Sequence, residues 1–144
     1  MILHAGLIAA RLGGVWQGVL IEGPAGAGKS DLALRSLDQG FQLVADDRVL
    51  LWTCEGQLYG RAPDALSGLL EVRGLDVLRL GALPLAEVAL IARCGPPERL
   101  PEPAFAELLG VSRPLIVINP REASAPAKLR RALSHFDAAH KRRI

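Results

Sequence analysis

Residues 23–30 are Gly23-Pro24-Ala25-Gly26-Ala27-Gly28-Lys29-Ser30, which has the spacing Gly-x-x-x-x-Gly-Lys-Ser. Glycines at these positions let the backbone wrap around an anion with its N–H groups pointing inward, and the lysine reaches the β and γ phosphates of a nucleoside triphosphate. The serine hydroxyl that follows is a ligand for Mg²⁺. The motif therefore predicts that residues 23–30 bind ATP and that Ser30 also binds the metal.

The segments on both sides of this loop favour a strand and a helix. Residues 18–21 form an apolar run that is typical of a strand buried on both faces. After Ser30, leucine and alanine recur at helical spacing until Gly40, which can end a helix in the left-handed conformation. This strand–loop–helix order is the context expected of a P-loop, and it argues against a glycine-rich turn that binds nothing.

Other apolar runs predict a single α/β domain with a mixed sheet over residues 1–144. We expect strands at 41–45, 48–52, 58–62, 87–92 and 115–119, with a hairpin turn at 55–57. Helical spacing predicts a helix from Asp64 to Val72, capped by Asp64 and ended by Gly74. A basic amphipathic helix is expected from Ala125 to Ala139, after a surface loop at 95–103.

Composition limits the class of protein. No run of about 18 apolar residues could span a bilayer, and the N-terminus lacks the features of a signal peptide, so we expect a cytoplasmic protein that does not bind membranes. Basic residues gather between Lys128 and Arg143 without interleaved aromatic residues, so nucleic acid is not indicated as a partner. Cys54 and Cys94 are far apart, which predicts two buried, reduced thiols and no zinc site.

A second motif is the adjacent pair Asp46-Asp47, which follows the apolar residues 43–45. We expect this pair at the end of a strand that lies next to the strand before the P-loop, within reach of the γ phosphate. A carboxylate in that position can hold Mg²⁺ or accept the proton of an attacking hydroxyl. The alternative is a pair of solvated turn residues.

Three segments in this order resemble the catalytic domain of HPr kinase/phosphorylase, a bacterial serine kinase of the phosphocarrier protein HPr. They are the P-loop, residues 43–49 (Leu-Val-Ala-Asp-Asp-Arg-Val) and residues 60–75, which contain Gly-Arg-Ala-Pro and then Leu-Leu-Glu-Val-Arg-Gly-Leu. Together they lie within residues 18–75, and the last segment is the most specific. The resemblance implies a fold similar to phosphoenolpyruvate carboxykinase and an ATP- and Mg²⁺-dependent kinase that acts on HPr or an HPr-like carrier.

The resemblance also implies roles for individual residues. Asp46 matches the family's base for the acceptor serine, and Asp47 matches its neighbour at the active centre. Glu71 matches a glutamate that helps to hold magnesium, and Arg73 matches an arginine of the catalytic surface. His4 is the best match for an early histidine that touches the aspartate pair. Further cations for the transferred phosphate are available from Lys29 and from Arg61, which could equally form a structural ion pair.

This chain also differs from the family pattern. It begins almost at the catalytic domain, as in a short form found in some proteobacteria, and it lacks the long loop that contributes to the reverse reaction. The family's Pro-Gly-Arg-Asn turn is represented only by Ser112-Arg113-Pro114 before the last strand. The resemblance therefore supports the kinase reaction better than phosphorolysis of phosphoserine. Relatives are oligomers, and we expect a homo-oligomer here.

Two other functions fit a P-loop chain. One is a small-molecule P-loop kinase, which usually carries an arginine-rich lid that is not evident between Pro96 and Pro103. The other is a nucleotide-dependent interaction module that binds ATP without transferring phosphate. Turnover with a carrier protein separates these alternatives from the serine kinase.

Overall fold

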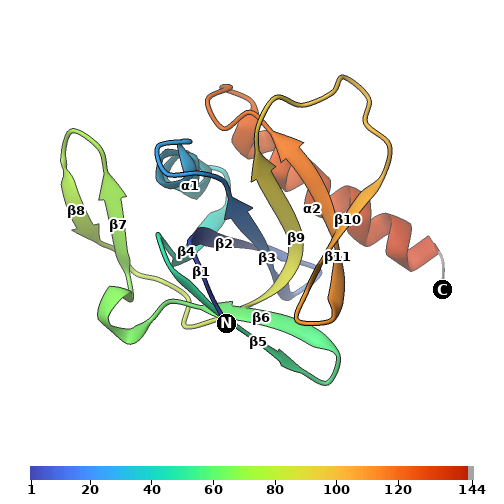
Figure 1. Ribbon diagram of the computed structural model, residues 1–144, viewed down its shortest axis with the longest axis horizontal. Helices are drawn as coiled ribbons and strands as arrows, with labels where there is room; N and C mark the ends of the chain where they lie inside the picture. Colours follow the sequence, from blue (N-terminus) through green and yellow to red (C-terminus); the bar gives the residue numbers. More distant parts are fainter. Residues whose placement is uncertain (143–144) are drawn as a thin grey trace.

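The computed structural model describes residues 1–142, with side chains through Asp137 (Figure 1). Its helices are α1 (Lys29–Leu37) and α2 (Ala125–Arg142), and a single 3-10 turn covers Asp64–Leu66. Its strands are β1 (Ile2–Leu3), β2 (Ala5–Leu12), β3 (Val15–Glu22), β4 (Phe41–Ala45), β5 (Val49–Cys54), β6 (Gln57–Arg61), β7 (Leu69–Val72), β8 (Asp76–Arg79), β9 (Ala86–Cys94), β10 (Ala104–Leu108) and β11 (Val111–Ile118). Basic residues 141–143 lie outside the described side chains.

The main sheet is mixed, which confirms the predicted fold class. Its strand order is β1-β5-β6-β9-β3-β2-β4. Strand β9 runs parallel to β3 and β11, whereas the other pairs are antiparallel. Strand β6 pairs with the first residues of β9 and β11 pairs with the last ones, so the sheet divides along β9.

Two apolar clusters cover the two faces of the central strands. Side chains alternate between the faces of a strand, so Ile8 lies in one cluster and Leu7 in the other. Helices α1 and α2 cover the first cluster through Leu32 and Leu129, and strands β5 and β6 cover the second. Among the described residues, neither helix is long and apolar enough to cross a membrane.

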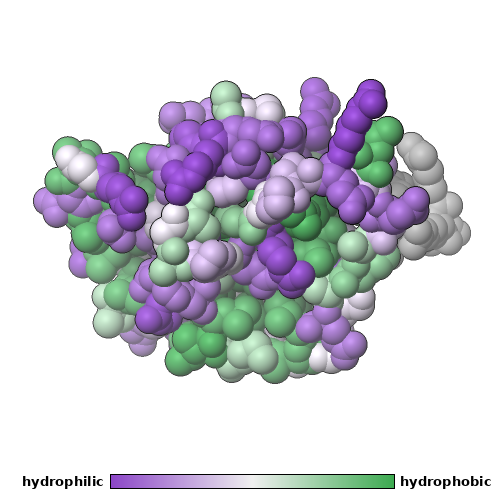
Figure 2. Space-filling model, turned by 45° about the horizontal axis from the view of Figure 1, so that its top comes forward, coloured by the Kyte–Doolittle hydropathy of each residue, from purple (hydrophilic) through white to green (hydrophobic). Residues whose placement is uncertain are grey.

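The ends of several strands meet at one edge of the sheet. Strands β3 and β11 each run parallel to β9, which lies between them, and β4 runs in the same direction because β2 is antiparallel to both β3 and β4. In Figure 1 the arrowheads of β9 and β11 point toward the top of the picture, and β3 ends at the loop before α1. Figure 2 brings this edge forward and shows hydrophilic residues spread over it, with hydrophobic residues gathered along the lower rim.

The helix predicted from Asp64 to Val72 is wrong. Only residues 64–66 form a 3-10 turn, and β7 and β8 then form a separate two-stranded hairpin, visible at the left of Figure 1. Gly68 adopts a φ of 75°, and its carbonyl accepts a hydrogen bond from the N–H of Leu80 at 2.7 Å, which closes the base of the hairpin. Leu70 is fully buried against the helices while Glu71 is exposed, so the local period is two and not 3.6.

Strand β2 was not predicted, and this changes the position of the aspartate pair. Because β2 forms a hairpin with β3 and then pairs with β4, the strand that ends at Ala45, just before Asp46, is two places away from the P-loop strand, not next to it. Ser112, Arg113 and Pro114 lie inside β11 and form no turn, and β10 was also missed. Cys54 is exposed and Cys94 is half-buried, so the prediction of two buried thiols is wrong for Cys54.

The other predicted elements are confirmed with small shifts of their ends. They include β3, α1, β4, the β5–β6 hairpin, β9, β11 and α2. Leu129 and Leu133 are buried on one face of α2, and Phe136 is partly buried beside them, as the amphipathic pattern predicts.

Candidate active site

The P-loop connects the end of β3 to the start of α1, as the motif predicts. Gly26 and Gly28 have φ values of 80° and 107°, a region that side chains with a Cβ rarely adopt. Gly28 is the N-cap of α1, and no side chain among the described residues caps it. The first turn of α1 therefore faces the loop with its backbone amides and the positive end of the helix dipole, which suits a phosphate.

The Lys29 side chain is held within this loop. Its ammonium donates hydrogen bonds to the carbonyls of Gly23 at 2.7 Å and Pro24 at 2.9 Å, and only 9% of the residue is exposed. A buried ammonium on backbone carbonyls, at the foot of an anion-binding loop, is placed to exchange those carbonyls for phosphate oxygens. The site therefore contains the fixed cation that a triphosphate requires.

Asp46 lies beneath the P-loop helix with both carboxylate oxygens occupied. Its Oδ1 accepts a hydrogen bond from the Ser30 hydroxyl at 2.7 Å, and its Oδ2 accepts one from the backbone N–H of Glu71 at 3.2 Å. The residue is 6% exposed. Asp46, which directly follows β4, therefore links β4 to α1 through Ser30 and to the β7–β8 hairpin through Glu71.

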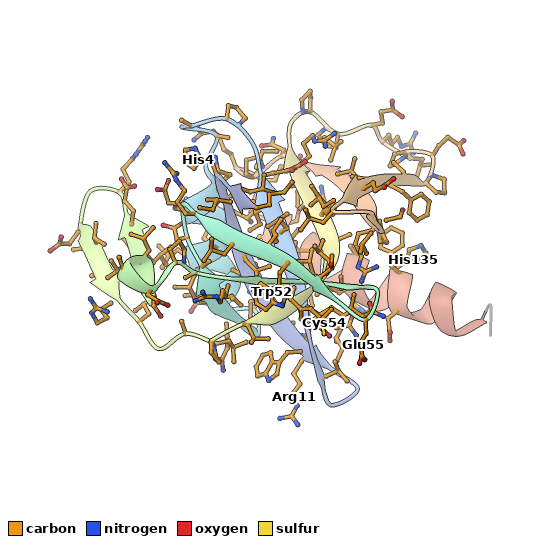
Figure 3. The ribbon with its side chains drawn as sticks, turned by 60° about the horizontal axis from the view of Figure 1, so that its bottom comes forward. His4, Arg11, Trp52, Cys54, Glu55 and His135 are labelled. Atoms are coloured by element: carbon orange, nitrogen blue, oxygen red, sulfur yellow. The ribbon has the colours of Figure 1, made fainter. Side chains whose placement is uncertain are left out.

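Asp47 points away from Asp46 and reaches solvent at the mouth of the site. Its Oδ1 lies 2.6 Å from Nε2 of His4, and its side chain is 57% exposed. His4 lies between β1 and β2, at the end of the molecule opposite Arg11 (Figure 3). The histidine suggested by the family resemblance is thus in contact with the aspartate pair.

The β7–β8 hairpin brings Glu71 and Arg73 to the same side of the site. Glu71 lies on β7 and Arg73 in the turn that follows it, and both residues line the cleft together with the P-loop and the aspartate pair. Arg61 does not line this cleft; its guanidinium bonds Asp64 at 3.0 Å, which supports the structural ion pair. The structure therefore brings together His4, Lys29, Ser30, Asp46, Asp47, Glu71 and Arg73.

Two arginines near the cleft were not predicted. Arg121 lines the cleft and donates a hydrogen bond to the Gly26 carbonyl at 2.9 Å. Arg35 of α1 bonds the carbonyls of Pro120 and Glu122, so the loop after β11 is fastened to the P-loop helix. A signal was available, because Arg121 lies two residues after the predicted strand at 115–119, in a loop at the edge of the sheet where binding residues are often found.

The cleft has a volume of about 560 Å³ and suits a nucleotide with a metal ion. Its donors are hard oxygens, a hydroxyl from Ser30 and carboxylates from Asp46 and Glu71, which is the set that Mg²⁺ prefers. Within the described part of the chain, no group of three or more His, Cys, Asp or Glu side chains could enclose a metal ion.

Comparison with known proteins identifies the family. The model of the HPr Serine kinase C-terminal domain matches residues 4–83, more than half of the chain. The chain belongs to the HPr serine kinase C-terminal domain family. The match begins at His4 and includes the P-loop, the aspartate pair and the β7–β8 hairpin.

Individual relatives agree with this assignment. The chain is 47% identical over 66 residues to the HPr kinase/phosphorylase of Clostridium tetani, and 46% identical over 66 residues to that of Clostridium beijerinckii. These matches cover 46% of the chain, which spans about a fifth (22%) of the length of either relative. The solved structure of the Hpr(Ser) kinase/phosphatase from Coxiella burnetii matches 98% of this chain and 99% of its own, with a TM-score of 0.81 and 25% identity.

The first glycine of the P-loop, Gly23, packs closely against Cys94 at the end of β9. A Cβ added at Gly23 would lie 2.9 Å from Cβ of Cys94. Overpacking of this kind costs about 1–3 kcal/mol. We expect Gly23→Ala to displace the loop and weaken ATP binding about tenfold, which corresponds to about 1.4 kcal/mol. Calorimetric titration of ATP measures this effect.

The matched control is the double variant Gly23→Ala/Cys94→Gly, which removes the opposing Cβ. It should bind ATP more tightly than Gly23→Ala alone. Equal affinity of the single and double variants would contradict the assigned contact between residues 23 and 94.

Proposed function

We propose that this protein is an ATP- and Mg²⁺-dependent serine kinase that phosphorylates HPr or an HPr-like phosphocarrier protein. The observation that carries the proposal is the single cleft lined by the P-loop, the Asp46-Asp47 pair and the hairpin that bears Glu71. The names of the relatives, HPr kinase/phosphorylase and Hpr(Ser) kinase/phosphatase, support this acceptor. The proposal includes a cytoplasmic homo-oligomer in which residues 1–144 form one catalytic domain, and it does not include phosphorolysis.

Binding of the nucleotide is assigned to the P-loop. The loop amides and Lys29 would hold the β and γ phosphates, and Arg121 would contact the same anion from the loop after β11. Ser30 and Glu71 would hold Mg²⁺, with Asp46 fixing the Ser30 hydroxyl from beneath. The metal would neutralise charge on the phosphates, which is the main requirement of phosphoryl transfer.

The geometry favours a change in the roles of the two aspartates. A base for the acceptor hydroxyl must be open to a protein substrate, and Asp47 is 57% exposed whereas Asp46 is 6% exposed. Asp46 is buried and its oxygens accept bonds from Ser30 and from the Glu71 N–H, two residues proposed for the metal site, whereas the oxygens of Asp47 are bonded by the exposed side chains of His4 and Arg48. We therefore assign Asp47 as the base and Asp46 to the metal site, in place of the base role first inferred for Asp46.

The proposed reaction follows from these positions. The acceptor serine oxygen attacks the γ phosphorus, its proton passes to the Asp47 carboxylate, and the bond between the γ phosphorus and the bridging oxygen breaks to release ADP. His4 bonds the other side of the base and keeps its carboxylate turned toward the cleft. Arg73 lines the cleft, and it would contact the transferred group or the acceptor.

The experiment is an assay with labelled ATP, Mg²⁺ and purified HPr, read by mass spectrometry for phosphoserine. We expect Mg²⁺-dependent transfer to a serine of HPr, and we expect Ser30→Ala to lower the rate because it removes a metal ligand. Tight ATP binding without transfer to HPr would instead support an interaction module. Transfer only to a small molecule would support a different P-loop kinase.

A further inference from the structure

The two aspartates are separated by an unusual turn of the backbone. The N–H of Arg48 donates to the carbonyl of Asp46 at 2.8 Å, and Asp47 between them has a φ of 69°. A three-residue turn whose central residue has a positive φ is rare and strained. Such a conformation costs about 1–3 kcal/mol and persists only where its surroundings hold it.

The turn has a direct consequence for the site. The side chains of consecutive residues on an extended backbone point to opposite faces, so Asp46 and Asp47 would differ in direction even without the turn. The turn in addition ends β4 and leads the chain into β5, with only Arg48 between Asp47 and the first residue of β5. Asp46 is thereby buried against Ser30 while Asp47 stands at the mouth of the cleft. The strained residue is thus the one that we assign as the base.

The side chain that holds this turn is Arg48. Its Nη1 donates to the backbone carbonyl of Asp47 at 3.0 Å and to Oδ2 of the same residue at 3.0 Å. One guanidinium therefore fixes both the peptide group and the carboxylate of Asp47. Because His4 bonds Oδ1, the two oxygens of the carboxylate are held from two sides.

We propose that Arg48 is a positioning residue that keeps Asp47 in its strained conformation and its carboxylate turned toward the acceptor. This inference rests on the proposed function, since it acts through the base of that reaction. Arg48 does not line the cleft, so it acts through Asp47 and not through the nucleotide. Misplacing a reacting group by about 1 Å can cost on the order of 10²-fold in rate.

The test compares Arg48→Ala, Arg48→Lys and a matched control, Arg61→Ala. The control removes an arginine of similar exposure, 41% against 43%, whose Nη1 bonds an aspartate at the same 3.0 Å but away from the cleft. We expect Arg48→Ala to lower kcat by about 10- to 100-fold with a nearly unchanged KM for ATP. Arg48→Lys should recover part of kcat because an ammonium can also donate to both oxygens.

A second measurement does not depend on kinase activity. The ¹⁵N NMR signals of the His4 imidazole report its bond to Asp47, and the chain has only three histidines. We expect these signals to shift in Arg48→Ala and to remain in place in Arg61→Ala. If the wild type does not phosphorylate HPr, the proposed function fails while this shift still tests the role of Arg48. Unchanged His4 signals in Arg48→Ala, or a normal kcat, would overturn the inference.

Discussion

Replacing Asp47 by asparagine is expected to lower kcat for phosphorylation of HPr by about 10²- to 10⁴-fold, the usual contribution of a positioned base. Asparagine keeps the size of the side chain and tolerates a positive φ, so the turn at residues 46–48 should survive. The amide cannot accept the serine proton. The decrease should therefore be in the rate of the chemical step. The affinity for ATP should stay within about twofold of the wild type, because Asp47 is not proposed to bind the nucleotide.

Steady-state kinetics and calorimetric titration of ATP measure these two quantities separately. The matched variant is Asp46→Asn, which changes the neighbouring carboxylate beneath Ser30. It should weaken Mg²⁺-dependent nucleotide binding as well as turnover. If Asp47→Asn retains normal turnover while Asp46→Asn loses turnover with normal ATP affinity, the base would be Asp46 after all.

The P-loop and its flanking elements could be predicted because their signals are local. A glycine-rich loop between an apolar run and a helical repeat determines β3, the turn and α1 within about 20 residues. The Asp46-Asp47 pair was predicted near the P-loop, and its contact with Ser30 confirms this proximity. The intervening strand β2 changed the order of the sheet but not the edge at which the pair lies.

The β7–β8 hairpin could not be predicted from periodicity alone. Leu66, Leu69 and Leu70 have helical spacing, and the same residues also allow a turn followed by a short strand. The deciding contacts are long-range, since Leu70 packs among buried residues of the helices and Glu71 bonds Asp46 across 25 residues. Tertiary packing of this kind overrides local propensity, and it also brings Glu71 to the cleft, where we propose that it holds Mg²⁺.

The roles of the two aspartates needed the backbone conformation of the turn. Two adjacent aspartates are equivalent in the sequence, and only the structure shows that Asp46 is buried while Asp47, with its positive φ, is exposed. Sequence signals for such a conformation are weak outside glycine, because aspartate adopts it only occasionally. The partners of Asp46 and Asp47, and not their order in the chain, are therefore the basis on which we propose one for the metal site and the other as the base.

Removing the Asp46 side chain is expected to affect stability as well as nucleotide binding. Asp46→Ala leaves the Ser30 hydroxyl and the Glu71 N–H without their acceptor in a part-buried region. Each buried donor left unpaired costs about 1–3 kcal/mol. We expect the free energy of unfolding to fall by at least that amount, and the hairpin that carries Glu71 to loosen from α1.

Urea unfolding with linear extrapolation measures the change, and Asp47→Asn is the control because that side chain is exposed and its change should stay within about 0.5 kcal/mol. Asp46→Ala with wild-type stability would show that the buried carboxylate does not join the hairpin to the P-loop helix. The double variant Ser30→Ala/Asp46→Ala separates the two bonds. The effects of substituting two residues in contact are not additive, so the free energy of unfolding should fall by less in the double variant than the sum of the falls in the single variants. The fall of the double variant beyond that of Ser30→Ala alone would belong to the bond between Asp46 and Glu71.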